Sequence, residues 1–114
     1  MSADCLFCRM ASGEIPVPKV HEDDLVFAIR DINPQAPTHV LVIPVAHVQS
    51  AADLTEADAP LLGRLFSVAA KIAADEGLDA GWRLVSNVGP EAGQSVPHLH
   101  VHLLGGRSMH WPPG

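Results

Sequence analysis

Three histidines near the end of the chain, His98, His100 and His102, alternate with apolar residues in the run HLHVHLL. A β-strand directs residues i, i+2 and i+4 to one face, so an extended run would place the three imidazole rings in a row and turn the apolar residues toward a core. Because histidine titrates closest to neutrality, three such rings indicate proton transfer, phosphoryl transfer or metal binding. A polar strand face that uses histidine as filler is the alternative.

Two cysteines near the N-terminus, Cys5 and Cys8, form a second candidate site with C-x-x-C spacing. In a reducing compartment this spacing is typical of half a metal site or of a redox pair, and a stable disulfide is disfavoured. A thioredoxin-type pair lies between a strand and a helix, whereas only four residues precede Cys5 here. A zinc site therefore fits better, provided that two further ligands exist.

Length and composition limit the class of protein. The 114 residues predict a single domain over residues 1–114 with one hydrophobic core. No apolar run approaches the length of a membrane span, and the first residues lack the pattern of a signal peptide, so we expect a cytoplasmic protein. A formal net charge of −6 with only seven Lys and Arg residues argues against nucleic acid as a partner. A small phosphorylated ligand stays compatible.

Periodicity and turn residues predict the elements that would position these side chains. They indicate a short helical turn over residues 5–12, strands near 20–21 and over 25–30, 38–44, 82–86 and 98–104, and one amphipathic helix over 58–76. The β-branched run THVLVIP is the strongest strand signal and is expected to be central in the sheet. Strands on both sides of one helix, with connections too short for repeated βαβ units, predict an α+β fold with a mostly antiparallel sheet.

The segments around the three histidines resemble the histidine-triad (HIT) family. The motif H-x-H-x-H followed by apolar residues matches the family signature. The segments DINPQAPTHVLVIPVAH, AGQSVPHLHVHLLGGR and MHWPPG look like those of the branch called histidine-triad nucleotide-binding proteins or purine nucleoside phosphoramidases. The resemblance covers nearly the whole chain. It implies a HIT-like fold, in which a five-stranded mostly antiparallel sheet with one long helix continues across a homodimer.

The resemblance also implies a reaction, the hydrolysis of purine nucleoside 5′-phosphoramidates at the P–N bond to a nucleoside monophosphate and an amine. His100 would attack the phosphorus and form a covalent nucleotidyl-histidine. That role requires a proton on its Nδ1 and an acceptor for this proton, which in the family is a backbone carbonyl. His102 and His39 would lie beside the phosphate, and the Ser95 hydroxyl would pass a proton to the leaving amine. Packing of His39 and a simple polar turn around Ser95 are the alternatives.

A set of nucleotide-binding residues follows from the same resemblance. Asp31 would accept hydrogen bonds from the ribose hydroxyls, although an Asx turn before Asn33 is a competing interpretation. The base would contact apolar side chains, each of which alone fits a core position better, namely Leu6, Phe7, Met10, Ile29 and Ile32. The phosphate would contact His100, His102 and loop residues that an ordinary turn also favours, namely Asn87, Gly93, Gln94, Ser95 and Val96.

The cysteines gain partners through the resemblance, because some family members bind zinc through two N-terminal cysteines and two histidines. The corresponding residues here are Cys5, Cys8, His47 and His98. Two thiolates and two imidazoles make a closed tetrahedral site with no open position for a substrate. We therefore expect structural zinc and no catalytic metal, with free thiols as the alternative.

The C-terminal tail carries Trp111 without a regular pattern. The resemblance implies that this indole packs across the dimer near the partner's active site, and a plug for its own subunit's core is the alternative. Pro97 stands where the relatives usually have an aromatic residue, and Asn33 replaces a commoner Ser. His21 and His110 have no assigned chemistry and are expected at the surface or at an interface.

Two other functions stay open. Other branches of the superfamily hydrolyse or phosphorolyse dinucleoside polyphosphates, although the Gly105-Gly106-Arg107 run and the MHWPPG tail favour the phosphoramidase. A zinc-stabilised nucleotide-binding or interaction module with incidental hydrolysis is the second alternative, and the intact set of catalytic positions argues against it.

Overall fold

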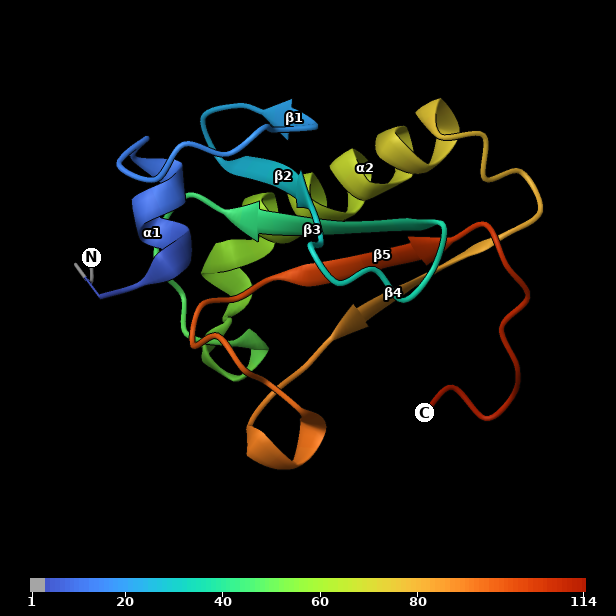
Figure 1. Cartoon of the computed structure of the whole chain (residues 1–114). Helices are drawn as coiled ribbons and strands as arrows, with labels where there is room; N and C mark the ends of the chain where they lie inside the picture. The colour runs from blue at the N-terminus through green and yellow to red at the C-terminus, as the bar shows by residue number, and fades with distance from the viewer. Residues whose placement is uncertain (1–3) are drawn as a thin grey trace.

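The chain folds around one five-stranded antiparallel sheet. The computed structural model describes residues 4–114, and the strand order is β1-β2-β3-β5-β4 (Figure 1). The main elements are α1 (Leu6–Ala11), β1 (His21–Glu22), β2 (Val26–Arg30), β3 (Thr38–Pro44), α2 (Ala59–Asp75), β4 (Trp82–Ser86) and β5 (Val101–Gly105). The predicted α+β fold and the central place of β3 are confirmed. Within the described residues, neither helix has the length and apolar character that a membrane crossing requires.

Helix α2 covers one face of the sheet and begins and ends within one residue of the prediction. Pro60 lies in its first turn, where a missing N–H costs nothing. Gly77 ends it with a φ of +72°, and the N–H groups of Gly77 and Leu78 donate to the carbonyls of Ala74 and Ala73. The buried residues of α2 repeat every three or four positions and are Leu65, Val68, Ala69, Ile72 and Ala73.

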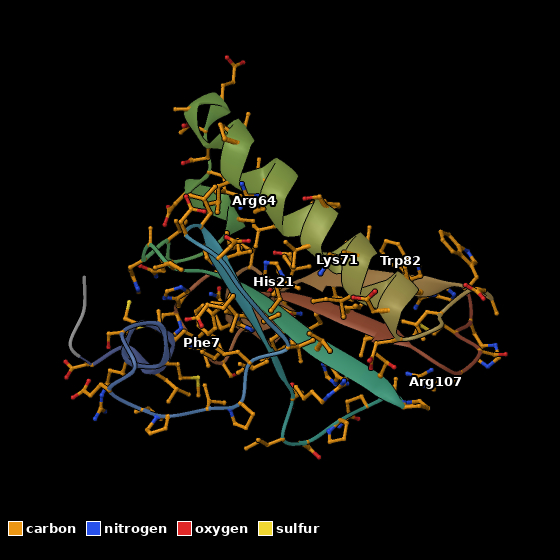
Figure 2. All side chains as sticks on the ribbon, turned by 90° about the horizontal axis from the view of Figure 1, so that it is seen from above. Phe7, His21, Arg64, Lys71, Trp82 and Arg107 are labelled. Carbon is orange, nitrogen blue, oxygen red and sulfur yellow. The ribbon has the colours of Figure 1, made fainter. Side chains whose placement is uncertain are left out.

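Alternation along β3 divides the core between the two faces of the sheet. Val40 and Val42 pack with α2, whereas Leu41 and Ile43 lie in a second apolar cluster that includes residues of α1. The two helices consequently lie on opposite sides of the sheet (Figure 2). The register pairs His102 of β5 directly with Leu41, so this histidine stands on the face that α2 leaves open.

The predicted strand over residues 98–104 begins three residues late, because β5 starts at Val101. The N–H of Leu99 donates to the carbonyl of Val48 at 2.6 Å, and the N–H of His98 is used in a local turn. These groups therefore bond outside the ladder of β5. His98 is completely buried, so the three imidazole rings do not form the open row expected of a strand face. The apolar residues that alternate with them are buried as predicted.

Candidate active site and metal site

Two groups of potential ligand side chains lie on the sheet face opposite α2. The thiol cluster consists of Cys5, Cys8, His47 and His98, and the carboxylate cluster consists of Asp31, His39 and His102. Within each cluster the ligand atoms all lie within 4.8 Å of one another. The four elements α1, β2, β3 and β5 bring these residues together, so positions from both ends of the chain meet on one face.

The thiol cluster has the geometry of a closed four-ligand site. The Sγ of Cys5 lies 3.1 Å from His98 Nδ1, and the Sγ of Cys8 lies 3.4 Å from His47 Nδ1 and 3.6 Å from His98 Nδ1. Metal–ligand bonds of zinc to sulfur and nitrogen imply separations of about 3.3 to 3.8 Å between ligand atoms in a tetrahedron. The observed separations between the ligand atoms are close to these values. Two thiols and two imidazoles are the donor set of structural zinc sites.

The buried ring of His98 is oriented for ligation by its backbone partner. Its Nε2 donates to the carbonyl of Pro44 at 2.8 Å, because a carbonyl can only accept. In the neutral ring the lone pair is then on Nδ1, which is the atom that faces both cysteines. Burial lowers the pKa of His98, so the neutral form that binds a metal is favoured.

The carboxylate cluster is a chain of hydrogen bonds with defined direction. The backbone N–H of Gln35 donates to His39 Nδ1 at 3.0 Å, so the proton of a neutral His39 ring is on Nε2. This Nε2 lies 2.9 Å from His102 Nδ1 and 3.4 Å from Asp31 Oδ2. The N–H of His39 therefore donates to His102, whose own proton is on Nε2. Gln35 is not among the predicted site residues, because a backbone N–H leaves no signature in the sequence.

The same hydrogen bonds disfavour a metal ion in the carboxylate cluster. A metal would need the lone pair of His39 Nε2, and that would move the ring proton to Nδ1, where the N–H of Gln35 already points. Burial lowers the pKa of His102 from its ordinary value of 6.5 to about 4, and the neighbouring histidine rings add to the shift. His102 is therefore neutral at neutral pH and can donate through Nε2.

His100 lies between the two clusters. Its Nδ1 donates to the carbonyl of His98 at 2.8 Å, which leaves the lone pair of a neutral ring on Nε2. Its ring centroid lies 5.1 Å from that of His102 and 5.2 Å from that of Phe7. The arrangement presents a neutral imidazole nitrogen beside a second imidazole that donates, which suits nucleophilic attack on a phosphorus centre.

The predicted phosphate loop is held in shape by its own amide side chains. Gly93 has a φ of +81°, a left-handed conformation that favours glycine. The amide of Asn87 donates to a carbonyl of the loop at 2.7 Å, and the amide of Gln94 donates to the carbonyls of Gln49 and Val96. Asn87 and Gln94 therefore brace the loop, while Ser95 is exposed.

A pocket of about 380 Å³ lies between this loop and the start of α1. Its wall includes Ser95 together with two residues of the thiol cluster, Cys5 and His47. Pro97 also lines it. Pro97 thus forms part of the wall of a pocket next to the predicted proton donor.

Asp31 forms the Asx turn, and its second carboxylate oxygen stays outside that turn. Its Oδ1 accepts from the N–H of Asn33 at 2.8 Å, which is an Asx turn, and its Oδ2 faces His39. The Asx turn orders the carboxylate beside the histidine pair, so the turn interpretation and the ribose interpretation are compatible.

The five predicted base contacts occupy different environments. Phe7 and Ile29 are buried in the cluster that packs on β3, and Met10 packs at its margin. Leu6 is exposed, and the side chain of Ile32 is 100% exposed. The structure therefore supplies one fully accessible apolar side chain, Ile32, directly after Asp31.

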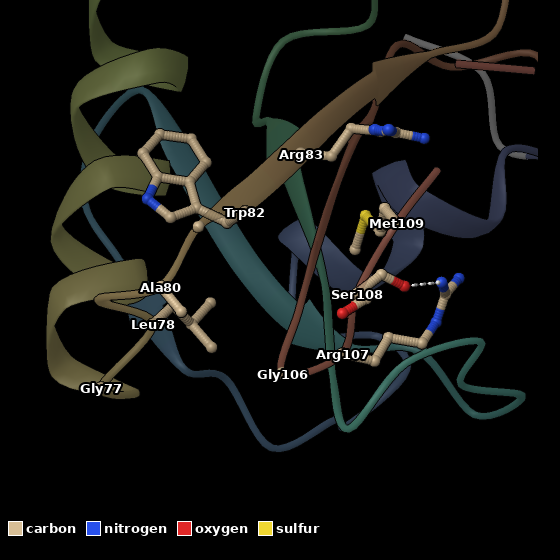
Figure 3. Close-up of a pocket in the computed structure, with 10 residues that line it drawn as sticks. Gly77, Leu78, Ala80, Trp82, Arg83, Gly106, Arg107, Ser108 and Met109 are labelled. Carbon is tan, nitrogen blue, oxygen red and sulfur yellow. Dashed lines mark hydrogen bonds between the residues drawn. The ribbon is translucent and has the colours of Figure 1, made fainter. Parts of the chain in front are cut away.

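The C-terminal tail folds along β4 without entering the core. Arg83 donates to the carbonyls of His110 at 3.1 Å and Pro113 at 3.4 Å. Trp111 is 86% exposed, so the interpretation of this indole as a plug for its own core is wrong. A cavity of about 600 Å³ at this edge is lined by residues 77–78, 80–83 and 106–109, and it includes none of the predicted site residues (Figure 3).

This α+β fold, with the H-x-H-x-H run on the sheet face opposite α2, is the arrangement expected of histidine-triad proteins. The family model described as HIT domain matches residues 12–109. The chain belongs to this family. Cys5 and Cys8 lie outside the matched residues, whereas His47 and His98 lie within them.

Comparisons with individual proteins agree with this membership. The crystal structure of a HIT family hydrolase from Legionella pneumophila has a TM-score of 0.94 and 52% identity, covering 97% of this chain and 100% of that chain. The structure of a histidine triad nucleotide-binding protein from Candida albicans has a TM-score of 0.81 and 30% identity, covering 96% and 83%. The 14 kDa zinc-binding protein of Brassica juncea is 49% identical over 113 residues, which span 97% of this chain and 100% of that protein.

Proposed function

We propose that this protein is a nucleotide hydrolase that cleaves purine nucleoside 5′-phosphoramidates at the P–N bond. The observation that carries the proposal is the hydrogen bond from His100 Nδ1 to the carbonyl of His98, which leaves Nε2 free as a nucleophile. The similarity to the HIT family hydrolase of Legionella pneumophila and the histidine triad nucleotide-binding protein of Candida albicans supports the class of reaction.

The reaction proceeds in two displacements. His100 Nε2 attacks the phosphorus in line, the P–N bond breaks, and the amine leaves with the proton of the Ser95 hydroxyl, which the attacking water of the second displacement restores. His102 donates from Nε2 to a phosphoryl oxygen and stabilises the developing charge, while His39 holds His102 in that tautomer. Water then attacks the nucleotidyl-histidine, which releases the nucleoside monophosphate and restores the neutral His100.

The nucleoside lies along the start of the loop after β2. Asp31 accepts from the ribose hydroxyls, and the exposed Ile32 packs against the base with Leu6 and Met10 at the rim. The phosphate group lies between the histidines and the Gly93–Val96 loop, where the N–H groups of Ser95 and Val96 face the anion, because those of Gly93 and Gln94 donate to the carbonyls of Pro90 and Gly89.

The thiol cluster is proposed to bind one structural zinc ion. The donor set, the distances between ligand atoms and the burial of three of the four residues fit such a site. The similarity to the 14 kDa zinc-binding protein of Brassica juncea supports the choice of metal. A closed set of four protein ligands leaves the ion no role in the phosphoryl chemistry.

Two chains are proposed to pair through β4 into a homodimer. β4 forms one edge of the sheet, and β5 is its one strand partner within the described residues. Unpaired edge strands are commonly covered by another chain. Trp82 at this edge is 41% exposed, so a second copy would extend the sheet and cover an indole. Sedimentation of the protein tests this, and a monomer at micromolar concentration would contradict it.

The function is tested by comparing turnover of an adenosine 5′-phosphoramidate with that of a diadenosine polyphosphate. We expect a higher kcat/KM for the phosphoramidate and a nucleotidyl-protein that can be trapped in acid. A preference for the dinucleotide would assign the protein to the polyphosphate hydrolases. Binding of nucleoside monophosphate without turnover of either substrate would indicate a binding module.

A further inference from the structure

His98 belongs to both the thiol cluster and the surroundings of the nucleophile. Its ring contacts both cysteines through Nδ1 and donates to Pro44 through Nε2, while its carbonyl accepts from His100 Nδ1 at 2.8 Å. The ring is completely buried and bonded at both nitrogens. The ring that contacts the cysteines and the carbonyl that keeps the proton on His100 Nδ1 thus belong to the same residue.

Phe7 makes a second connection between the same two places. It lies between the two cysteines in the first turn of α1, and its ring meets His98 at 5.7 Å and His100 at 5.2 Å, edge to face in both pairs. Helix α1 has six residues, whereas isolated helices need about 12 to 15 to be stable. Its position consequently depends on what holds its ends, and the Sγ of Cys5 caps its N-terminus.

We propose that metal binding at the thiol cluster positions the nucleophile, through the His98 carbonyl and the Phe7 ring, so that metal occupancy controls turnover. This inference rests on the proposed function and adds regulation of the same site. With the four ligands bound to zinc, α1 and His98 hold the His100 ring with its proton on Nδ1. Loss of the metal replaces four coordinate bonds with weaker hydrogen bonds among the same atoms.

The carboxylate cluster does not share this dependence. His39 is held by the N–H of Gln35, and the His39–His102 pair joins two strands that pack against each other in the centre of the sheet. Metal removal should therefore change His100 and leave His102 unchanged. In kinetic terms we expect kcat to fall by a larger factor than KM rises, because Asp31, His39 and His102 keep their places while only the α1 side of the base site is loosened.

The first experiment measures the ring tautomers of His100 and His102 by ¹⁵N NMR in the zinc-loaded protein and after chelation. We expect one sharp Nδ1–H tautomer for His100 with zinc, and broadened or mixed signals without it. The Nε2–H tautomer of His102 should stay the same in both samples. Identical His100 signals in the two samples would overturn the proposal and leave the proposed function intact.

The second experiment separates positioning from loss of fold with Phe7→Leu, which keeps the four ligands. We expect one zinc per chain, a broadened His100 signal and a fall in kcat of about tenfold or more with little change in KM. Phe27→Leu is the matched control, because Phe27 is buried in the same apolar cluster, whereas within the described residues the phenylalanine ring that contacts His100 is that of Phe7. We expect its His100 signal and kcat to match those of the wild type.

The outcomes distinguish the two proposals. A raised KM with unchanged kcat in Phe7→Leu would assign Phe7 to the base pocket and overturn its positioning role. Absence of turnover by the zinc-loaded wild type would remove the proposed function, whereas the NMR comparison would still decide whether the metal orients His100. If chelation unfolds the protein, Phe7→Leu decides alone: a wild-type His100 signal in this zinc-loaded variant would overturn the proposal.

Discussion

The thiol cluster and the carboxylate cluster each pair two histidine rings on the same sheet face, with ring nitrogens at similar separations. The distance is 3.1 Å between His47 Nδ1 and His98 Nδ1, and 2.9 Å between His39 Nε2 and His102 Nδ1. In the thiol cluster a backbone carbonyl accepts a hydrogen bond from His98 Nε2, which leaves the lone pair on Nδ1 for a metal. In the carboxylate cluster a backbone N–H donates a hydrogen bond to His39 Nδ1, which keeps the ring proton of His39 on Nε2.

The backbone partner of each imidazole ring decides which nitrogen carries the proton, and therefore what the ring can do chemically, more than its neighbours in the sequence do. His98 and His102 stand four residues apart in one run, yet one offers a lone pair to two thiols and the other offers a proton to the open side of the sheet. His100 lies between them, with its proton held by the carbonyl of His98. The predictions below remove one part of this arrangement at a time.

The largest effect is expected for His100→Ala, which removes the ring between the clusters and leaves both clusters complete. We expect turnover of the phosphoramidate to fall by at least about a thousandfold, because the neighbouring rings of His39 and His102 carry their protons on Nε2 and cannot attack. Nucleoside monophosphate should still bind, since Asp31, His39 and His102 are untouched. Single-turnover kinetics and calorimetry measure the two quantities. Turnover within tenfold of the wild type would show that His100 is not the nucleophile.

The next effect is expected for Cys8→Ser, which breaks the thiol cluster alone. We expect loss of stoichiometric zinc and a decrease in the free energy of unfolding of about 3 kcal/mol, because a three-ligand site binds the ion weakly. Metal analysis and urea unfolding measure the change. The wild type after chelation is the control and should unfold at the urea concentration of the variant. One zinc per chain in the variant would contradict the assigned ligands.

The elements of the fold could be predicted where local pattern and long-range packing agree. The run THVLVIP forms the central strand because both of its faces are buried, and α2 follows the spacing of its apolar residues between Pro60 and Gly77. The start of β5 could not be predicted, because the N–H of Leu99 bonds to Val48, about fifty positions earlier in the chain. Period-two alternation extends across this point without a break.

The residues of the candidate site could be predicted from the sequence, but the ring nitrogen that carries the proton in each histidine could not. The family resemblance brought Cys5 and His98 together across 93 positions, and the structure places their atoms 3.1 Å apart. The tautomers depend on the backbone groups of Pro44, Gln35 and His98 itself. Every residue has such groups, so no pattern of side chains reveals which of them a ring will meet.

A smaller effect is expected for His39→Asn, which breaks the hydrogen-bond chain of the carboxylate cluster. Without the N–H of His39, the proton of His102 is no longer kept on Nε2, so we expect kcat to fall by about 10- to 100-fold. Zinc content should not change, because His39 has no contact with the thiol cluster. His21→Asn is the matched control, since His21 bonds to Asp23 outside both clusters. Equal kcat values for the two variants would show that the hydrogen bond from His39 to His102 does not support catalysis.

The smallest effect is expected in the free energy of unfolding as a function of pH, because the pKa of His102 differs between the folded and the unfolded chain. Burial lowers the pKa of His102 to about 4, below its ordinary value of 6.5. Between these values the unfolded chain binds more protons than the folded one, so stability is present above pH 6.5 and is lost as the pH falls toward 4. The free energy of unfolding of the wild type minus that of His102→Gln isolates this contribution, because both proteins keep the zinc ligands. We expect this difference to decrease over that window, and a constant difference would mean that His102 is not buried as a neutral ring.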